Sequence, residues 1–434
     1  MIRKVLLLCL GIVVFSCVDE LDIAVTNNGE IDNILIVEAT LTDELKKHSV
    51  TLSRMDTILD LGIDSTFNPF GTINSVNLDL IKYEENAEVM VVSSSGTEFD
   101  FTEVSAGIYE SDMVFAAQLN ESYILKVKTS NGKGYTSEKC EIRGTSGIEK
   151  IYAEKIINDE GTEGIGIFID SDVIEGESQN LRFLYDETYK IIAPNWSPSK
   201  FRLTNYDPCA LPVPTYNLEI IAQEEETQVC FRTIKSNLIL QTQLSNLTNG
   251  GVKKFMVRFL KKDNFIISHR YSIEIAQLVS STASFGFYEK LNNFSKSGNV
   301  FSQVQPGFLN GNLTSDDGSL DNVIGLFDVV SSTKERLFFN YTDFYPNDEL
   351  PPFPFNCTIN SSPESHRSYC ATGPDGGTSC PLSIIEQIDL GLITYVGRND
   401  SNIGDCPGPY AYVSKICGDC RTLGSNIVPE FWEE

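Results

Sequence analysis

The chain has 434 residues, of which 41% are hydrophobic, and its formal net charge at pH 7 is −27. At roughly 100–200 residues per domain the length predicts two or three domains, and the apolar content argues against general disorder. The excess of acidic groups would repel the phosphates of nucleic acid and an anionic lipid surface alike, so we expect no nucleic-acid partner and no basic membrane-binding patch.

The first residues have the pattern of an export signal. Arg3 and Lys4 form a short positive start, and residues 5–15 form an apolar run that is too short to span a bilayer. The run ends at Val14-Phe15-Ser16-Cys17. A small residue directly before a cysteine in this position resembles the processing site of a bacterial lipoprotein.

This resemblance predicts a lipid anchor. Residues 1–16 would be removed as the signal peptide, and Cys17 would be acylated and become the first mature residue. Several acyl chains anchor a protein stably, since each buried CH₂ contributes about 0.8 kcal/mol. The alternative is an ordinary cleaved signal with an incidental cysteine.

The segment after the cysteine adds a hint about location. Cys17 is followed by Val18-Asp19-Glu20-Leu21-Asp22, and residues 17–33 form an acidic tether. Acidic residues here resemble the export tag of surface-exposed lipoproteins in some Gram-negative bacteria, although a plain solvated linker has the same composition. We therefore expect an outer-membrane lipoprotein that faces outside, with the periplasmic face as the alternative.

The next region predicts a β-sandwich. Apolar and polar residues alternate, or short Val-rich runs occur, in segments of strand length, namely residues 34–42, 50–53, 89–92, 99–102 and 123–128. Ser130-Asn131-Gly132-Lys133 is typical of a hairpin turn, because Asn-Gly tolerates positive φ. Strands separated by turns every 8–12 residues or so favour an Ig-like or transthyretin-like β-sandwich over residues 34–143. Residues 56–79 would form a long insertion at one end, where binding loops often lie.

A larger β-rich domain is predicted for residues 148–434. Further strand patterns occur at residues 148–152, 165–169, 181–192, 254–260, 266–278 and 323–330. Ser315-Asp316-Asp317-Gly318 indicates a turn rather than a calcium loop, because the further ligand spacing is missing. The expected fold class is therefore mainly β.

One helix stands out in this second domain. Tyr288, Leu291 and Phe294 recur at three-residue spacing, and Ser281 or Ser284 could cap the start of the helix. We interpret the aromatic stripe as core packing rather than as a ligand site.

The cysteines indicate an oxidising compartment. Without Cys9 of the signal and the lipid-bearing Cys17, nine of the eleven remain. Most of them cluster near the end of the chain, and we expect disulfides among Cys209, Cys230, Cys357, Cys370, Cys380, Cys406, Cys417 and Cys420. A Cys209–Cys230 bridge would contribute about 3 kcal/mol, Cys140 is left unpaired by count, and the six C-terminal cysteines allow many connectivities.

Cys417-Gly418-Asp419-Cys420 is a C-x-x-C motif that also occurs in zinc sites and thiol redox centres. No second C-x-x-C accompanies it, and the following residues, 421–425, indicate a loop rather than the opening of a helix. We favour a structural disulfide role, and predict neither a metal nor another cofactor.

Candidate catalytic residues are few. His48, His269 and His366 are the only imidazoles, and neither H-x-x-x-H nor G-x-S-x-G nor a Walker pattern is present. Carboxylates are abundant enough to leave a glycosidase pair open, but a solvated acidic surface is the simpler interpretation. We therefore predict no enzymatic activity.

Several segments together carry a family resemblance. They are Leu35-Ile36-Val37-Glu38-Ala39-Thr40-Leu41-Thr42-Asp43, Val50-Thr51-Leu52-Ser53-Arg54, Gly107-Ile108-Tyr109, Tyr123-Ile124-Leu125-Lys126-Val127, Val229-Cys230-Phe231, Tyr288-Glu289-Lys290-Leu291, Val323-Ile324-Gly325-Leu326-Phe327 and Cys417-Gly418-Asp419-Cys420-Arg421 with Phe431-Trp432. The chain resembles a domain-of-unknown-function lipoprotein family, numbered four-two-four-nine, whose members are typically encoded beside TonB-dependent outer-membrane receptors. The family has no established catalytic residues to carry over.

The resemblance and the lipid signal together imply a binding role. We expect a non-catalytic accessory of a TonB-dependent receptor in nutrient uptake, which captures substrate or covers the mouth of the receptor. The alternatives are a surface adhesin or structural envelope lipoprotein without a transporter partner, and a hydrolase acting on glycans or peptides.

Overall fold

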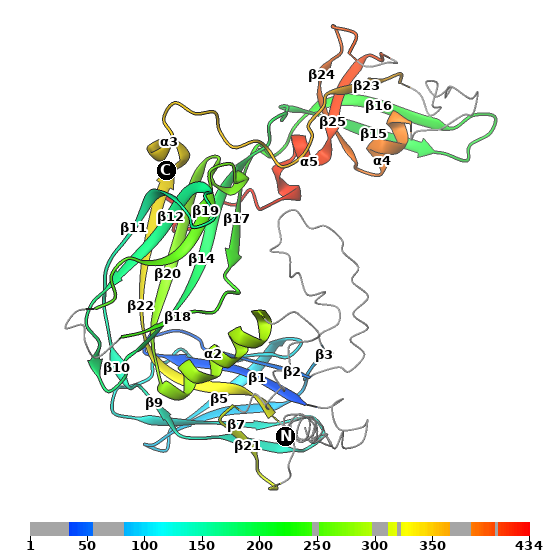
Figure 1. Ribbon diagram of the computed structural model, residues 1–434. Helices are drawn as coiled ribbons and strands as arrows, with labels where there is room; N and C mark the ends of the chain where they lie inside the picture. Colours follow the sequence, from blue (N-terminus) through cyan, green and yellow to red (C-terminus); the bar gives the residue numbers. More distant parts are fainter. Residues whose placement is uncertain are drawn as a thin grey trace, which may run out of the picture.

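The computed structural model describes residues 34–54, 82–244, 251–296, 311–318, 323–364, 383–403 and 407–434. The predicted signal peptide, the predicted acylation site Cys17, the expected tether and the insertion expected at 56–79 lie outside these ranges, as do Cys370, Cys380, Cys406 and His366. Two β-sandwiches form a body, and a small arm projects from it (Figure 1). The expected mainly β fold is confirmed. Within the described ranges, every helix is too short or too polar to cross a membrane.

The N-terminal sandwich follows the predicted alternation. Its first nine strands are β1 (Leu35–Thr42), β2 (Ser49–Arg54), β3 (Lys82–Tyr83), β4 (Glu88–Ser93), β5 (Glu98–Ser105), β6 (Ile108–Ser111), β7 (Ser122–Lys128), β8 (Gly134–Ser137) and β9 (Cys140–Glu141). The inward residues Val37, Leu52, Val91 and Leu125 are fully buried. The predicted hairpin turn joins β7 to β8, and Gly132 there has a φ of 86°.

Two strands from much later in the chain complete this sandwich. β21 (Leu313–Ser315) pairs with β8, and the first part of β22 (Val323–Asn340) pairs in parallel with β1. Asn312 ties the two additions together, because its side-chain amide donates to the carbonyl of Phe327 at 2.8 Å and accepts from the Phe327 N–H at 2.9 Å. The unit predicted at 34–143 therefore takes in residues from the second half of the chain.

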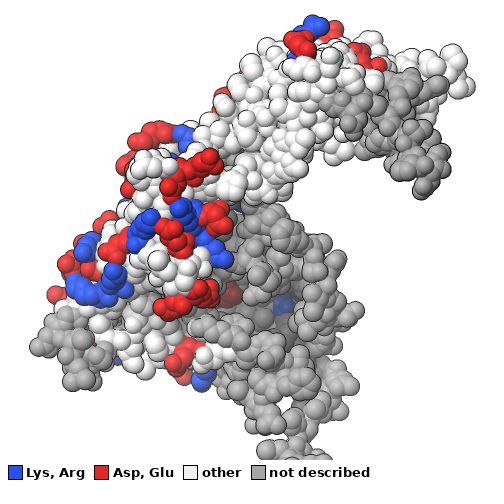
Figure 2. Space-filling view, turned by 45° about the horizontal axis from the view of Figure 1, so that its top comes forward, with Lys and Arg blue, Asp and Glu red and all other residues white. Residues whose placement is uncertain are grey.

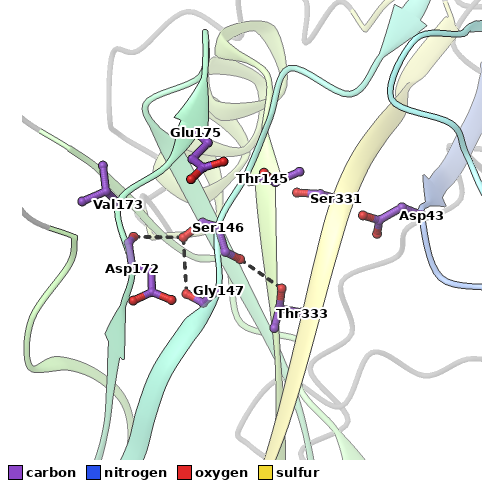
Figure 3. A pocket seen from close by; sticks show the side chains of 9 residues that line it. All are labelled: Asp43, Thr145, Ser146, Gly147, Asp172, Val173, Glu175, Ser331 and Thr333. Atoms are coloured by element: carbon purple, nitrogen blue, oxygen red, sulfur yellow. Dashed lines mark hydrogen bonds between the residues drawn. The ribbon is translucent and has the colours of Figure 1, made fainter.

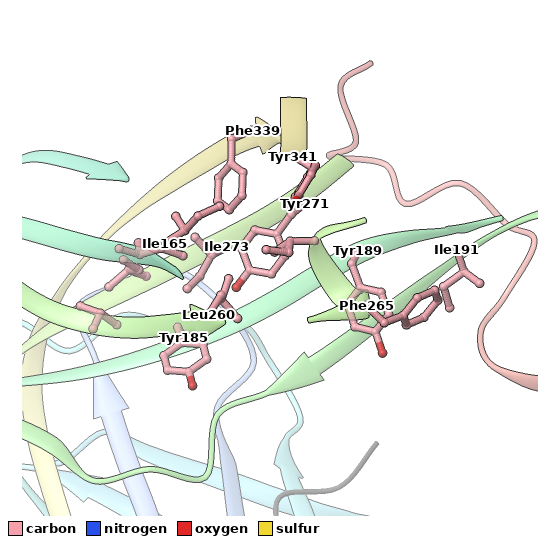
Figure 4. Packing of buried hydrophobic residues seen from close by; sticks show 14 of the residues in the cluster. Ile165, Tyr185, Tyr189, Ile191, Leu260, Phe265, Tyr271, Ile273, Phe339 and Tyr341 are labelled. Carbon is pink, nitrogen blue, oxygen red and sulfur yellow. The ribbon is translucent and has the colours of Figure 1, made fainter. Parts of the chain in front are cut away.

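The central sandwich packs two sheets around the largest core (Figure 4). The smaller sheet consists of β11 (Ile148–Ile157), β12 (Glu163–Ser171) and β19 (Phe255–Lys261). The larger sheet consists of β14 (Asn180–Ile192), β17 (Val229–Lys235), β18 (Leu240–Gln243), β20 (Arg270–Ser280) and the second part of β22. Short elements complete this part: β10 (Gly144–Thr145), β13 (Glu175–Gly176), η3 (Phe265–Ile267) and α3 (Tyr341–Phe344).

The larger sheet has two different faces because side chains alternate along each strand. Tyr185, Tyr189, Tyr271 and Ile273 point into the core. The other face meets helix α2 (Thr282–Lys296), which lies in the corner between the two sandwiches (Figure 1). The helix predicted from the aromatic stripe is thus present.

Of the two serines predicted as possible caps of α2, Ser281 caps the helix, since its hydroxyl accepts from the backbone N–H of Ser284 at 3.1 Å. The strand predicted to start at Ile266 starts later, at Arg270, because the Asn264 side chain accepts from the Ile266 N–H and folds this stretch into η3.

The arm was not predicted from the sequence. It contains β15 (Ser199–Asp207), β16 (Thr215–Ala222), β23 (Asn360–Ser362), α4 (Ile384–Asp389), β24 (Ile393–Arg398) and β25 (Tyr410–Ser414), and α5 (Lys415–Gly418) and η4 (Cys420–Thr422) lead back to the body. The stretch at 421–425 expected to be a loop therefore begins with a short 3₁₀ helix.

Two disulfides join the arm to the body. Cys230 pairs with Cys420, and Cys357 pairs with Cys417. The expected structural role of the C-x-x-C motif is confirmed, but each of its cysteines bonds to a different partner. The Cys209–Cys230 pairing suggested by the sequence is wrong, because Cys230 lies on β17 beside residue 425 in the body, whereas Cys209 is an exposed free thiol in the arm.

Cys140 is also a free thiol, as the count predicted. It lies half-buried on β9, where its Sγ donates to the carbonyl oxygen of Phe327 at 3.2 Å. Burial raises the pKa of this thiol to about 12, so it is protonated and a poor nucleophile.

Candidate binding groove

A groove of about 880 Å³ lies between α2 and the sheet that continues from one sandwich into the other. β14 supplies one side and β1 with β22 supplies the other, and α2 lies over the space between them (Figure 1). β1 and β22 come so close that a side chain at Gly325 would collide with the backbone oxygen of Val37. The groove is thus built by the junction of the two sandwiches.

The walls of the groove are mainly aliphatic. Leu184 is 38% exposed and Leu238 is 44% exposed, and both line the groove. Ile324 and Leu326 face it from β22, and Leu291 faces it from α2. Leaving several large apolar side chains accessible in a concave site is typical of small-molecule binding pockets.

The lining of the groove also includes polar and charged side chains. Arg182 on β14 lines it but is only 5% exposed, and its guanidinium carbon lies 4.1 Å from the ring centre of Tyr288. This distance indicates a cation–π contact that fixes α2 on the sheet. Among the described residues, Arg182 Nε has no hydrogen-bond partner. A buried guanidinium with a free donor is costly unless something else binds it.

A buried carboxyl group lies near this arginine. Asp328 on β22 is 3% exposed. Burial raises its pKa, while the positive charge of Arg182 opposes that shift without cancelling it. Asp328 Oδ2 is itself without a hydrogen-bond partner in the described part of the chain. Asp328 Oδ2 and Arg182 Nε are therefore not bonded to each other.

A family comparison bears on this region. The model of a family described as Domain of unknown function (DUF4249) matches residues 18–336, well over half of the chain. The chain belongs to this family. No curated protein matches it. The match confirms the family resemblance and carries no information about neighbouring receptors.

The residues that line the groove lie within the part of the chain that the DUF4249 model matches. All residues that line the groove lie between Ile36 and Leu326, inside the matched range. The match ends before β23, β24 and β25 of the arm and before the C-x-x-C motif. The resemblance of that C-terminal ending to the family therefore stays a prediction.

The sequence located α2 but missed the groove. The stripe interpreted as core packing is half-buried at Tyr288 and Leu291, because these side chains line the groove instead of a closed core. Arg182 lies inside a predicted strand and was not predicted as a site residue. A signal was present: alternation places Arg182 and Leu184 on the face opposite Phe183 and Tyr185, so one face of β14 combines a charge with exposed leucine.

A second cavity, of about 570 Å³, lies near β10 and the middle of β22 (Figure 3). The Ser146 hydroxyl donates to the carbonyl of Asp172 at 3.0 Å, and Thr333 donates to the carbonyl of Ser146 at 3.0 Å. Asp43 lies on the far side of β22 from these groups in Figure 3 and accepts from the Ser332 N–H at 2.8 Å. These polar groups satisfy one another, so we interpret this cavity as structural.

The two described histidines lie in different sandwiches. His48 is buried beside Phe115, and its Nε2 is 2.9 Å from the Phe115 carbonyl oxygen. His269 lines a small cavity with Lys190 and Arg270 in the central sandwich. Burial lowers the pKa of both imidazoles. Among the described residues, no cluster of three or more His, Cys, Asp or Glu side chains has the geometry to hold a metal ion.

Proposed function

We propose that this protein is a non-catalytic binding lipoprotein of the outer membrane, anchored through Cys17, which serves as an accessory of a TonB-dependent receptor in nutrient uptake. The observation that carries the binding role is the groove beneath α2. Its volume of about 880 Å³ lies in the range of ligand pockets, and its mainly aliphatic lining includes one buried charged group, Arg182.

The chemistry of the lining supports binding. Its described polar side chains are hydroxyls and amides, with Arg182 and Glu38 as the charged groups. Such a set can orient a ligand, and an arginine that is always protonated is a poor general base. The sequence supports the location through the lipoprotein signal and the acidic tether.

The anchor is tested by fractionation. The Cys17→Ala variant should leave the membrane fraction and appear in the soluble fraction, because it lacks the acylated side chain. Cys209→Ala is the matched control: it removes an exposed free thiol of the arm and should leave the protein in the membrane. Membrane association of the Cys17→Ala variant would contradict the proposal.

The partner is tested by purification. Tagged protein captured from mildly solubilised outer membranes should bring a β-barrel receptor with it in stoichiometric amount. The Cys17→Ala variant, captured from the soluble fraction, gives the background. Capture of the wild type without any such receptor would argue for a protein that acts alone.

The arm keeps a second candidate function open, namely adhesion. It projects away from the body, and on the face shown in Figure 2 most of its described surface is uncharged, whereas acidic and basic side chains crowd the body. An adhesin predicts that deletion of the gene weakens attachment and leaves uptake intact. The receptor accessory predicts the opposite result.

A further inference from the structure

We propose that the groove beneath α2 takes ligands with an apolar body and a carboxylate head, and that Arg182 binds the carboxylate. This inference rests on the proposed binding function and specifies the class of ligand. It is independent of the partner and of the anchor.

The shape of the groove sets the first requirement. Leu184, Leu238 and Ile324 provide accessible hydrocarbon on two sides, and Phe287 adds an aromatic edge from α2. Covering such surface removes apolar area from water and so stabilises a complex. A fully polar ligand would gain nothing from these walls, so the bound molecule needs an apolar body.

The buried arginine sets the second requirement. Arg182 is withdrawn from water, Tyr288 covers one side of its guanidinium, and its Nε is unpaired among the described residues. A guanidinium matches a carboxylate with two parallel N–H···O bonds, and such charge-assisted bonds are about twice as strong as neutral ones. A carboxylate head would complete the partners that this side chain lacks.

Two acidic side chains of the protein could bind Arg182 in place of a ligand carboxylate, and neither takes that place. Glu38 lines the groove from β1 but is exposed, so water screens its charge. Asp328 is buried and is not among the side chains that line the groove, so it does not reach a bound ligand there. The desolvated arginine therefore dominates the electrostatics of the groove.

The test uses three probes of equal chain length: decanoate, decanol and decyltrimethylammonium. Each is titrated into the chain without its predicted signal peptide and anchor cysteine, residues 18–434, and binding is followed by displacement of the uncharged dye N-phenyl-1-naphthylamine. We expect decanoate to bind about tenfold more tightly than decanol, and decyltrimethylammonium to bind most weakly. Equal affinities for decanoate and decanol, preference for the cation, or binding of none of the three would overturn the proposal.

Variants assign the selectivity to the arginine. Arg182→Met keeps an apolar stem and should bring decanoate and decanol within about twofold of each other, while Arg182→Lys should give an intermediate ratio because it keeps the charge and loses the fork. Arg398→Met removes an exposed cation of the arm and should leave the ratio unchanged. Selectivity that survives in Arg182→Met would contradict the assignment.

A further variant covers the case in which Arg182→Met unfolds the protein. Leu184 is partly exposed, so Leu184→Glu should fold and place a negative charge on the wall while Arg182 remains. Decanoate should then lose about tenfold in affinity, and decyltrimethylammonium should gain. Unchanged binding of both would show that the probes do not enter the groove.

The results separate this inference from the proposed function. Capture of a receptor together with absent carboxylate selectivity would refute the ligand class alone. Selective decanoate binding without a receptor partner would leave the ligand class standing and refute the accessory role.

Discussion

In the central sandwich, side chains on the facing strands are withdrawn from water almost completely, whereas most apolar side chains of the arm are only half-buried. Tyr189, Ile191 and Tyr271 in the body are at most 1% exposed. In the arm, Ile384 and Ile385 reach that level, but the hydrophobic residues around them on β15, β16 and β24 remain accessible in part. The same kinds of strand thus give two interiors of different depth.

This difference in burial follows from the smaller size of the arm. A small unit has too little interior to bury its apolar surface fully, and small domains often compensate with disulfides. Here Cys230–Cys420 and Cys357–Cys417 lie where the arm meets the body. The backbone of Cys417 accepts from Asn195 and that of Cys420 donates to Thr227, so this junction clamps both ends of the β15–β16 hairpin.

The deeper interior of the body can also hold charge. Glu187 on β14 accepts two hydrogen bonds from Arg258, at 3.1 Å each, and one from the hydroxyl of Tyr271 at 2.8 Å. Burial raises the pKa of Tyr271 well above its ordinary value, and the negative charge of Glu187 adds to that effect. The tyrosine therefore remains a donor to Glu187.

The largest expected effect is the loss of stability when the buried pair of Glu187 and Arg258 is broken. Glu187→Gln should lower the free energy of unfolding of the body by about 3 kcal/mol, near the lower end for a broken buried pair, because Arg258 keeps some contact with water. Urea unfolding measures it. Glu88→Gln, which removes one partner of an exposed ion pair with Lys128, is the control and should cost less than about 1 kcal/mol. Equal losses of unfolding free energy in the two variants would show that a buried pair contributes no more to stability than an exposed one.

The next effect concerns the arm. Replacing Cys357 and Cys417 together by Ala should destabilise the arm by about 2–4 kcal/mol, because the unfolded chain is no longer cross-linked. Limited proteolysis should then cut within residues 199–222 and 383–414 while the body resists. Cys209→Ala, at an exposed free thiol in the arm, should leave the cleavage pattern unchanged. An arm that resists protease without this disulfide would show that its own core is sufficient.

The contrast between body and arm also explains what the sequence could predict. Strands such as β1 and β7 in the body have one deeply buried face, so alternation of apolar and polar residues predicted them. The half-buried strands of the arm give a weaker signal, because their burial differs little from one face to the other.

Long-range pairings escaped prediction because no local pattern encodes them. The strand at Val323–Val330 was predicted, but its parallel pairing with β1 depends on the return of the chain after almost three hundred residues. Cys230 meets Cys420 rather than Cys209 because β17 lies beside the C-terminal segment. The groove depends on the pairing of β1 with β22, since β22 brings its aliphatic residues opposite Arg182 only in the folded chain.

The smallest effect is a pH dependence in the N-terminal sandwich. Burial raises the pKa of Glu84, but hydrogen bonds from Arg54 and Ser130 outweigh it, so the net pKa lies below its ordinary value of 4.5. A carboxyl group whose pKa is lower in the folded state stabilises the protein above pH 4.5, and this contribution is lost as the pH falls through the folded-state pKa. Glu84→Gln should therefore be less stable than the wild type near neutral pH, and the two should converge as the solution is acidified. Urea unfolding between about pH 6 and about pH 3 tests this, and a constant difference between the two proteins over that range would show that Arg54 does not depend on the charge of Glu84.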